Sequence, residues 1–318
     1  MRKASYKKHE LIFKQASGTS RGVLKKKETF FLEISENNKT GIGECGLFRG
    51  LSADDKPEYE EKLQWVCTNI HLEKSQLLKE LTKFPSIQFG LEQAFLSLKS
   101  ENPFELFQTN FTRKSAPINI NGLIWMGSAD FMQQQIEDKL KQGFTTIKLK
   151  IGAIDFEKEC ELLASIRKRY SSKEIELRVD ANGAFTPENA LEKLNRLAEF
   201  DLHSIEQPIK QGQHIAMAEL CSKTPLPIAL DEELIGIFNY SEKKKLIETI
   251  QPQFIILKPS LVGGISGSNE WIQISEENNI DWWITSALES NIGLNAIAQY
   301  TASLNTTMPQ GLGTGGLF

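Results

Sequence analysis

Six short apolar segments in the C-terminal two thirds of the chain each end on a polar residue, and five of these end residues are ionisable. Successive end residues lie 25 to 30 residues apart, which is about the length of one strand followed by one helix. Carboxylates and amines brought together from several strands could hold a hard metal ion and move protons at carbon. The residues are Lys150, Asp180, Glu206, Asp231, Lys258 and Ser286.

The three acidic members of this set indicate a divalent metal site. Asp180, Glu206 and Asp231 end three consecutive apolar segments, and their carboxylates would repel one another in a partly buried cleft unless a cation neutralised them. Oxygen ligands alone suit Mg²⁺, with Mn²⁺ as the alternative, and the four histidines lack the spacing of zinc ligands. Asp180 taken alone is more typical of a helix cap, so the prediction depends on the whole set.

The stretch TTIKLKIG, residues 145–152, predicts the base of a proton transfer. On a strand, Lys148 and Lys150 place their side chains on one face. That face fits the solvated side of an exposed strand or the inside of a barrel, and the helical pattern that follows favours the inside. Nearby positive charge lowers the pKa of a lysine, which suits it to remove a proton α to a carboxylate. Lys258 would flank the same ion from the opposite side.

Two different patterns of elements position these residues. The first hundred residues read as strands followed by three helices, a small α+β unit, and from Pro117 onward short apolar runs alternate with helical segments. Repeated βα units predict a closed parallel barrel; a doubly wound open sheet is the competing topology, but it would place a ligand motif at one switch point. We expect one domain over residues 1–112 and a barrel over 113–310, with the tail 311–318 packing back towards the first.

The composition excludes several classes of protein. The 318 residues include 37 Lys and Arg against 41 Asp and Glu, with 40% apolar residues, which argues against a nucleic-acid binder and a disordered chain. No apolar run approaches the length of a membrane span. The four scattered cysteines favour a reducing, cytoplasmic location. Residues 25–27, KKK, predict a solvated strand edge, and the loop 17–22 is a candidate lid.

The motifs resemble the muconate-lactonizing subgroup of the enolase superfamily. KLK at 148–150, DAN at 180–182, IEQP at 205–208, LDE at 230–232 and LKPS at 257–260 are similar to its lysine and acidic motifs. The resemblance covers nearly the whole chain. It implies an α/β fold, a modified TIM barrel of the (β/α)₇β form with an N-terminal α+β capping domain.

Within the subgroup, LRVDANGAF and ITSALESNIGL resemble the o-succinylbenzoate synthase family. That resemblance implies a Mg²⁺-dependent lyase that dehydrates 2-succinyl-6-hydroxy-2,4-cyclohexadiene-1-carboxylate to 2-succinylbenzoate in menaquinone biosynthesis. Dipeptide epimerases of the subgroup typically carry two acids on the last barrel strand, and the matching stretch here, TMPQGLGTGG, has none. The alternatives are an N-acylamino acid racemase, a dipeptide epimerase, a muconate cycloisomerase or a binding barrel without catalysis.

The resemblance also implies roles for single residues. Lys150 is expected to take the α proton and Lys258 to stabilise the enediolate as a cation. Strand alternation places Lys148 one inward-facing position deeper, where we expect it to lower the pKa of its neighbour and to contact a substrate carboxylate oxygen. Whether Glu233, where relatives often have serine, alters the metal site stays open, as does the oligomeric state. The partner is a small carboxylate. The expected metal ligands are Asp180, Glu206 and Asp231, and the expected substrate contacts are Asn182, Arg178, Ser286, Leu288 and Glu289.

Overall fold

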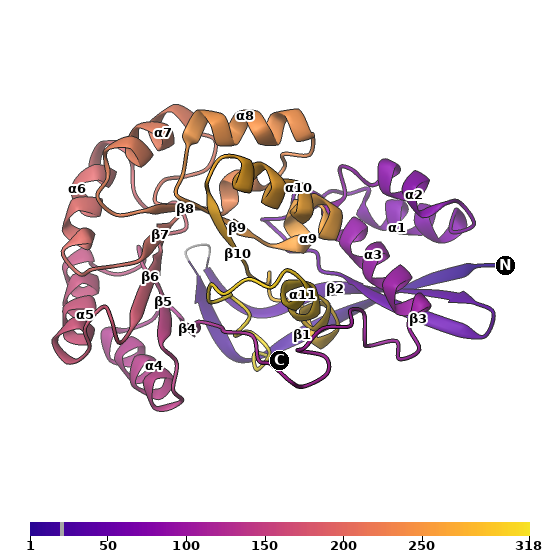
Figure 1. The fold of residues 1–318 in the computed structure, drawn as a ribbon, viewed down its shortest axis with the longest axis horizontal. Coiled ribbons are helices and arrows are strands. Elements are labelled where there is room, and N and C mark those ends of the chain that lie inside the picture. Colours follow the sequence, from indigo (N-terminus) through magenta and orange to yellow (C-terminus); the bar gives the residue numbers. More distant parts are fainter. Residues whose placement is uncertain (20–21) are drawn as a thin grey trace.

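The N-terminal part of the chain is a three-stranded antiparallel sheet covered by helices (Figure 1). The computed structural model describes residues 1–19 and 22–318, so the tip of the candidate lid lies outside the described residues. The predicted order of strands followed by helices is confirmed. The elements are β1 (Lys3–Thr19), β2 (Gly22–Glu36), β3 (Lys39–Cys45), α1 (Tyr59–Thr68), α2 (Lys74–Glu80) and α3 (Pro85–Lys99).

Strand β3 crosses helix α3 at very short range, and two glycines make this crossing possible. A Cβ atom on Gly41 would lie 2.2 Å from the Ala94 carbonyl oxygen, and one on Gly43 would lie 2.0 Å from the Gly90 carbonyl oxygen. Any larger residue would push the helix off the sheet. The close crossing fixes β3 relative to α3, and both elements also contact the second part of the chain.

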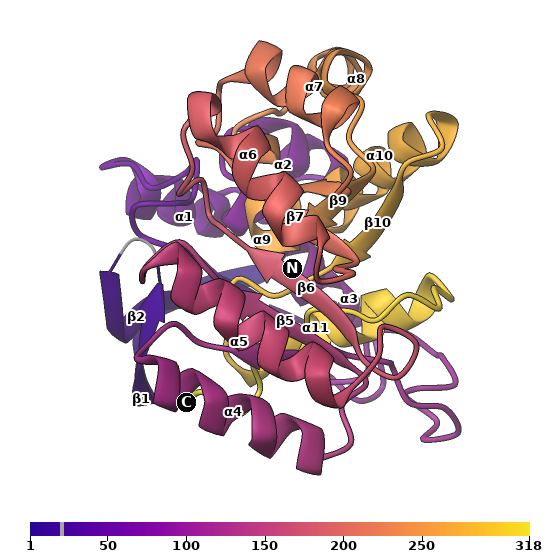
Figure 2. The same ribbon diagram turned by 90° about the vertical axis from the view of Figure 1, so that its left-hand side faces the viewer.

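The second part alternates strands and helices, and its parallel strands have the order β10-β9-β8-β7-β6-β5-β4. In Figures 1 and 2 the helices lie outside the curved sheet. Each predicted apolar run contains one of these strands. The strands are β4 (Gly122–Ile124), β5 (Thr146–Lys150), β6 (Glu176–Asp180), β7 (Ser204–Glu206), β8 (Ile228–Leu230), β9 (Phe254–Leu257) and β10 (Asp281–Ile284). The helices are α4 (Ala129–Lys141), α5 (Phe156–Arg169), α6 (Pro187–Ala198), α7 (His214–Lys223), η1 (Glu232–Leu234), α8 (Tyr240–Ile250), α9 (Pro259–Val262), α10 (Gly264–Glu277) and α11 (Asn291–Ser303).

A short extended segment closes the ring between the first and last of these strands. Gln310 bridges Ile120 beside β4, and Gly311 bridges Thr285 at the end of β10, both in parallel orientation. The amide of Asn121 donates to the Gln310 carbonyl over 3.0 Å. The segment therefore acts as a final strand without a helix after it, as the (β/α)₇β form requires, and the predicted fold class is confirmed.

Two carboxylates from the N-terminal part bind the N-terminal ends of barrel helices. Glu44 on β3 accepts hydrogen bonds from the backbone amides of Ser290 (3.0 Å) and Gly293 (2.8 Å) at the start of α11. Glu92 on α3 accepts from the backbone amide of Ile265 (2.6 Å) at the start of α10. Unsatisfied amides and the helix dipole both favour an anion at these positions. The two parts of the chain are thus joined by charged caps as well as by apolar packing.

Two further contacts concern the tail and the lysine run. The backbone amide of Lys14 donates to the Leu317 carbonyl over 2.8 Å, and the rings of Phe13 and Phe318 lie 4.6 Å apart. The tail therefore packs on β1.

The prediction of a solvated edge is wrong for Lys27. Strand β2 carries this side chain inward, and it is only 6% exposed. Burial lowers the pKa of Lys27, and the nearby carboxylates of Glu44 and Glu289 act in the opposite direction. No helix in the described ranges is long and apolar enough to cross a membrane.

Candidate active site

Three of the strand-end residues occupy one row across neighbouring strands. Lys150 on β5 is in register with Asp180 on β6, which is in register with Glu206 on β7. Side chains at the same register in a parallel sheet point to the same face. On β5, the apolar residues Ile147 and Leu149 alternate with the lysines and point instead to the buried side that the helices cover. Strand alternation thus places one cation and two anions side by side at the carboxyl end of the barrel.

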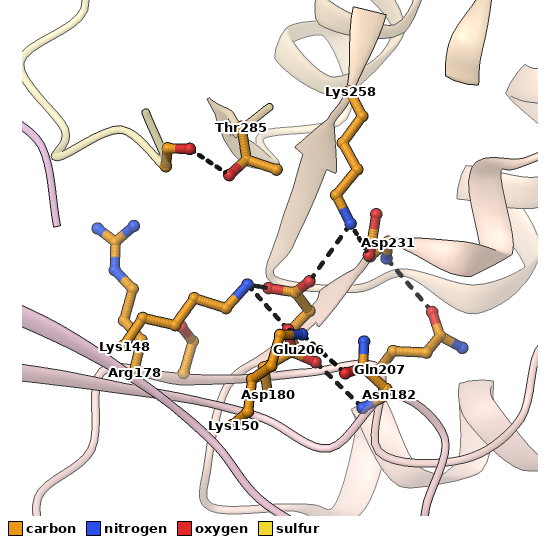
Figure 3. A network of polar contacts seen from close by, with 12 residues as sticks. Lys148, Lys150, Arg178, Asp180, Asn182, Glu206, Gln207, Asp231, Lys258 and Thr285 are labelled. Atoms are coloured by element: carbon orange, nitrogen blue, oxygen red, sulfur yellow. Dashed lines mark hydrogen bonds and ion pairs between the residues drawn. The ribbon is translucent and has the colours of Figure 1, made fainter. Parts of the chain in front are cut away.

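Lysine ammonium groups bridge the carboxylates of this row (Figure 3). Lys148 Nζ lies 3.0 Å from Asp180 Oδ2 and also donates a hydrogen bond to Glu206 Oε2. Lys150 Nζ lies 2.8 Å from Asp180 Oδ2 and 2.8 Å from Asn182 Oδ1. From across the barrel, Lys258 Nζ donates to Asp231 Oδ2. The structure therefore brings the two predicted lysines of β5 and the opposite lysine to the same acidic cluster.

Burial and charge act in opposite directions on these groups. Burial favours the neutral form of Lys148, but Asp180 and Glu206 outweigh it and raise its pKa, so this lysine stays charged. For Asp180, burial is outweighed by Lys148 and Lys150, which hold its pKa well below the usual range. Burial and the neighbouring Asp180 raise the pKa of Glu206. Burial is likewise outweighed at Lys258, where Asp231 and Glu206 raise the pKa and maintain a cation.

Asn182 connects Lys150 to Glu232, the residue that follows the third acidic strand end. Its backbone has a left-handed φ of 44° directly after the strand, and its amide nitrogen donates to Glu232 Oε1 over 3.0 Å. Glu232 accepts only, so the contact turns the amide oxygen of Asn182 towards Lys150. Glu232 and Asp231 thus have separate tasks, since Asp231 contacts Lys258 instead.

A single pocket joins these groups to an apolar wall from the N-terminal part of the chain. Phe48 and Leu51 come from the segment after β3, whereas Leu123 and Trp125 come from the first barrel strand and its end. Such a pocket suits a ligand with one charged end and a hydrophobic body. The other lining residues are Asn121, Lys148, Lys150, Asp180, Asn182, Lys258, Thr285, Ser286, Ala287, Leu288, Gly311, Gly313 and Thr314.

Two residues expected to contact substrate do not line this pocket. Arg178 lies one inward-facing position deeper than Asp180, and its guanidinium packs 4.4 Å from the Trp283 ring centroid and donates to the Pro309 carbonyl. Figure 3 shows it pointing away from the carboxylates. Glu289 is 1% exposed and accepts hydrogen bonds from Ser260 and the amide of Ala287. Both side chains therefore support the walls, whereas Ser286 and Leu288 reach the pocket.

The question about Glu233 has a clear geometric answer. Its carboxylate accepts hydrogen bonds from the Gln207 side chain (2.9 Å) and the Gly212 amide (2.7 Å), and His214 Nε2 lies 3.0 Å away. It thus points into the loop between β7 and α7. The additional negative charge is bound by that loop and stays out of the lysine and carboxylate cluster.

Comparisons with known proteins agree with this architecture. The family described as Enolase C-terminal domain-like matches residues 131–314. The o-succinylbenzoate synthase of Desulfotalea psychrophila is 47% identical over 99% of this chain and 94% of that protein. The chain belongs to the o-succinylbenzoate synthase family. The crystal structure of MenC from Desulfotalea psychrophila LSv54 superimposes on this family member with a TM-score of 0.88 at 44% identity, covering 100% of this chain and 95% of that one.

More distant relatives share the fold of the o-succinylbenzoate synthase family. The L-Ala-D/L-Glu epimerase of Bacillus subtilis is 28% identical over 56% of this chain and 48% of that protein. An o-succinylbenzoate synthase structure from Thermosynechococcus elongatus BP-1, described as complexed with Mg in the active site, has a TM-score of 0.79 at 20% identity, covering 99% of this chain and 92% of that one. At that identity the likeness shows the fold alone.

The residues of this family member fit a hard divalent cation in their chemistry. Asp180, Glu206 and Asp231 are all at most 2% exposed, and Glu206 Oε1 is buried without a hydrogen-bond partner among the described residues, with Lys258 Nζ 3.9 Å away. Within the described residues no three acidic, histidine or cysteine side chains already form a metal-binding group, and ammonium groups lie between the carboxylates. Ammonium groups thus lie where a cation is required to neutralise the three carboxylates.

Several pocket residues of this o-succinylbenzoate synthase family member escape prediction from sequence. Phe48, Leu51 and Trp125 are apolar residues at loop positions, and their sequence context resembles that of many surface loops. Asn121 and Thr314 come from the two segments that meet where the barrel closes. Only the expectation that a final strand lies beside the first could have pointed to this pair.

Proposed function

We propose that this chain catalyses the Mg²⁺-dependent dehydration of 2-succinyl-6-hydroxy-2,4-cyclohexadiene-1-carboxylate to 2-succinylbenzoate, a step of menaquinone biosynthesis. Identity of 47% with an o-succinylbenzoate synthase over almost the whole of both chains supports the reaction. The observation that carries the proposal is the meeting of Lys150 and Lys258, from β5 and the end of β9, around three buried carboxylates, of which Asp180 lines the same pocket as the two lysines. The proposal includes a capping domain of residues 1–112 and a barrel domain of 113–310.

The lysines divide the acid and base work. Lys150 removes the proton on the carbon next to the substrate carboxylate, and the electrons of that C–H bond flow into the carboxylate. They return to form the new ring double bond as the C–O bond of the hydroxyl group breaks. The proton on Lys150 joins the departing hydroxide, so water leaves and the ring becomes aromatic. Lys258 stays cationic and stabilises the negative charge that develops in between.

Asp180, Glu206 and Asp231 are the proposed metal ligands, and Asn182 lies next to them. Bound Mg²⁺ would supply a Lewis acid for the substrate carboxylate. Asn182 holds Lys150 through its amide oxygen, and Lys148 helps to keep Asp180 ionised. Phe48, Leu51 and Trp125 would exclude water from the ring of the substrate.

Racemisation of an N-acylated amino acid is a second candidate. Lys150 and Lys258 lie on opposite sides of the cluster, so one could remove an α proton and the other could return a proton to the opposite face. The residues that close the barrel, Gln310 to Thr314, carry no acid that could bind an α-ammonium group. The pocket therefore favours acylated substrates over free amino acids or dipeptides.

A direct assay tests the proposed reaction. The cyclohexadiene substrate is incubated with the protein, with and without EDTA, and its absorbance is followed; added Mg²⁺ should restore turnover after chelation. Turnover that EDTA does not affect, or no turnover, would overturn the proposal. Exchange of the α proton of N-succinyl amino acids for solvent deuterium reports the second activity separately.

The location and partners complete the proposal. A small carboxylate substrate matches the pocket, and the described cysteines are all free, which is consistent with the reducing cytoplasm. The chain is proposed to act there without a nucleic-acid or membrane partner.

A further inference from the structure

The loop that follows Lys150 is held by a buried carboxylate that the proposed mechanism does not use. Glu159 lies in the first turn of α5 and is 2% exposed. Its Oε1 accepts a hydrogen bond from the backbone amide of Gly152 over 2.7 Å, whereas its Oε2 is buried without a hydrogen-bond partner among the described residues. The side chain thus reaches back from the helix to the loop that begins directly after the proposed base.

This contact is maintained against the cost of burying an acid. Burial raises the pKa of Glu159 to about 7, and the backbone amides of residues 152–154 and the ammonium group of Lys193 act in the opposite direction. The other buried residues of α5 are apolar, and an apolar residue at position 159 would avoid the cost. The carboxylate therefore supplies what packing alone does not, an acceptor for the amides of the loop.

Gly152 connects the place of Lys150 to that of Asn182. It turns the chain with a left-handed φ of 91°, and a Cβ atom on it would lie 2.3 Å from the Cβ atom of Ala184. The loop after β5 therefore touches the loop after β6 at this point. Ala184 comes two residues after Asn182, whose amide oxygen lies 2.8 Å from Lys150 Nζ. Because Glu159 holds Gly152, it fixes the contact between the two loops that carry the base and its partner.

We propose that Glu159 is a positioning residue for the proton transfer, because its carboxylate fixes the backbone after β5 and thereby the place of Lys150 Nζ. The role rests on the proposed function. Lysine has a flexible four-carbon stem, so its amine has a defined position only where its backbone and its neighbours are held. A displacement of about 1 Å at the reacting atoms can cost about 10²-fold in rate. Glu159 is not among the described residues that line the pocket, so its loss should affect the rate of the chemical step and not ligand affinity.

Steady-state kinetics and amide hydrogen exchange test this role. Glu159→Leu removes the acceptor and fills the same space, and we expect kcat to fall by about 10-fold or more while KM and the affinity for Mg²⁺ stay within about 2-fold. Exchange of the amides of residues 152–154 should become about 10-fold faster or more, because their acceptor is gone. Glu159→Gln keeps an oxygen for the Gly152 amide, so its kcat should stay within about 3-fold of wild type.

Asp155→Ala is the matched control. Asp155 caps the same helix by accepting from the backbone amide of Lys158 over 3.3 Å, so its loss should lower the free energy of unfolding and leave kcat within about 2-fold. If Glu159→Leu fails to fold, Glu159→Asp should show the same loss of kcat, because its shorter side chain withdraws the carboxylate from the loop. A wild-type kcat in Glu159→Leu, or an equal loss in Asp155→Ala, would overturn the positioning role.

The exchange measurement does not depend on turnover. Faster exchange in Glu159→Leu together with a wild-type chain that does not dehydrate the substrate would contradict the proposed reaction alone. Unchanged exchange of residues 152–154 in Glu159→Leu would contradict the role of Glu159 in the loop, whatever the rate of turnover.

Discussion

Asp54 offers a stability test of the segment that forms the apolar wall of the pocket. This segment carries Phe48 and Leu51 over the site, and Asp54 anchors its end by accepting hydrogen bonds from the backbone amide (2.9 Å) and hydroxyl (2.7 Å) of Ser86. Asp54 is fully buried, and its Oδ1 has no hydrogen-bond partner in the part of the chain that the structure describes. Burial raises the pKa of Asp54 to about 6, although the hydrogen bonds from Ser86 act in the opposite direction.

The magnitude follows from linkage between protonation and folding. The pKa of Asp54 is about 6 in the folded chain against 3.8 for an ordinary aspartate, a gap that corresponds to about 3 kcal/mol. The folded state holds a proton that the unfolded state releases, so this stabilisation is fully present below pH 3.8. It is lost as the pH rises through about 6. Asp54→Asn cannot ionise, and its free energy of unfolding should therefore rise relative to wild type by about 3 kcal/mol between pH 4 and pH 8.

Urea unfolding of both proteins at several pH values measures this difference. Asp55→Asn is the matched control, because burial is outweighed there by the Gly50 amide and Arg49, which lower the pKa of Asp55. Its difference from wild type should run in the opposite direction as the pH rises. A difference between Asp54→Asn and wild type that stays constant across this pH range would refute the claim that burial raises the pKa of Asp54.

Three other substitutions address the site and its supports. Lys150→Ala should lower the rate of turnover by about 10³-fold or more, while calorimetry still detects Mg²⁺ binding. Retained activity would exclude Lys150 as the base. Glu44→Ala leaves buried donors of Thr29, Ser290 and Gly293 without an acceptor. The free energy of unfolding, measured by urea titration, should therefore fall by about 3 to 5 kcal/mol, and a loss under 1 kcal/mol would contradict the role of Glu44 as a helix cap between the two parts of the chain. Glu233→Gln should leave Mg²⁺ affinity within about 2-fold, and a larger change would place Glu233 at the metal site.

The barrel and its charged rim could be predicted because their signals are local and periodic. Each strand is a short apolar run, and register in a parallel sheet converts a regular spacing into a shared position, as in the row of Lys150, Asp180 and Glu206. Arg178 shows the limit of this reasoning. It shares a face with Asp180, but one inward-facing position deeper it meets Trp283 and a backbone carbonyl instead of the pocket.

Contacts between the two parts of the chain were beyond prediction. Lys27 stands in a run of three lysines that is typical of a solvated edge, and only the fold brings Glu44 and Glu289 close enough to act on its buried charge. Phe48 and Leu51 follow a strand of one part and line a pocket in the other. Such positions depend on how two units pack, and a single sequence has no periodic signal for that packing.

The charge of Lys148 gives the cluster a second consequence. Its ammonium group contacts both Asp180 and Glu206, two of the proposed metal ligands, so it stabilises the acids without a metal and competes with any divalent cation for them.

Lys148→Met should therefore have opposite effects in the two states. Without metal, two buried carboxylates lose their partner, and the midpoint of thermal unfolding should fall by several degrees. With Mg²⁺ the repulsion between the lysine and the ion is gone, so the affinity for Mg²⁺ should rise by about 10-fold or more and the ion should raise the midpoint more than in wild type. Lys243→Met, which removes another buried lysine that pairs with Glu270 and not with these acids, is the control. If Mg²⁺ stabilised Lys148→Met less than the wild-type chain, Lys148 would be a requirement for the metal site and not its competitor.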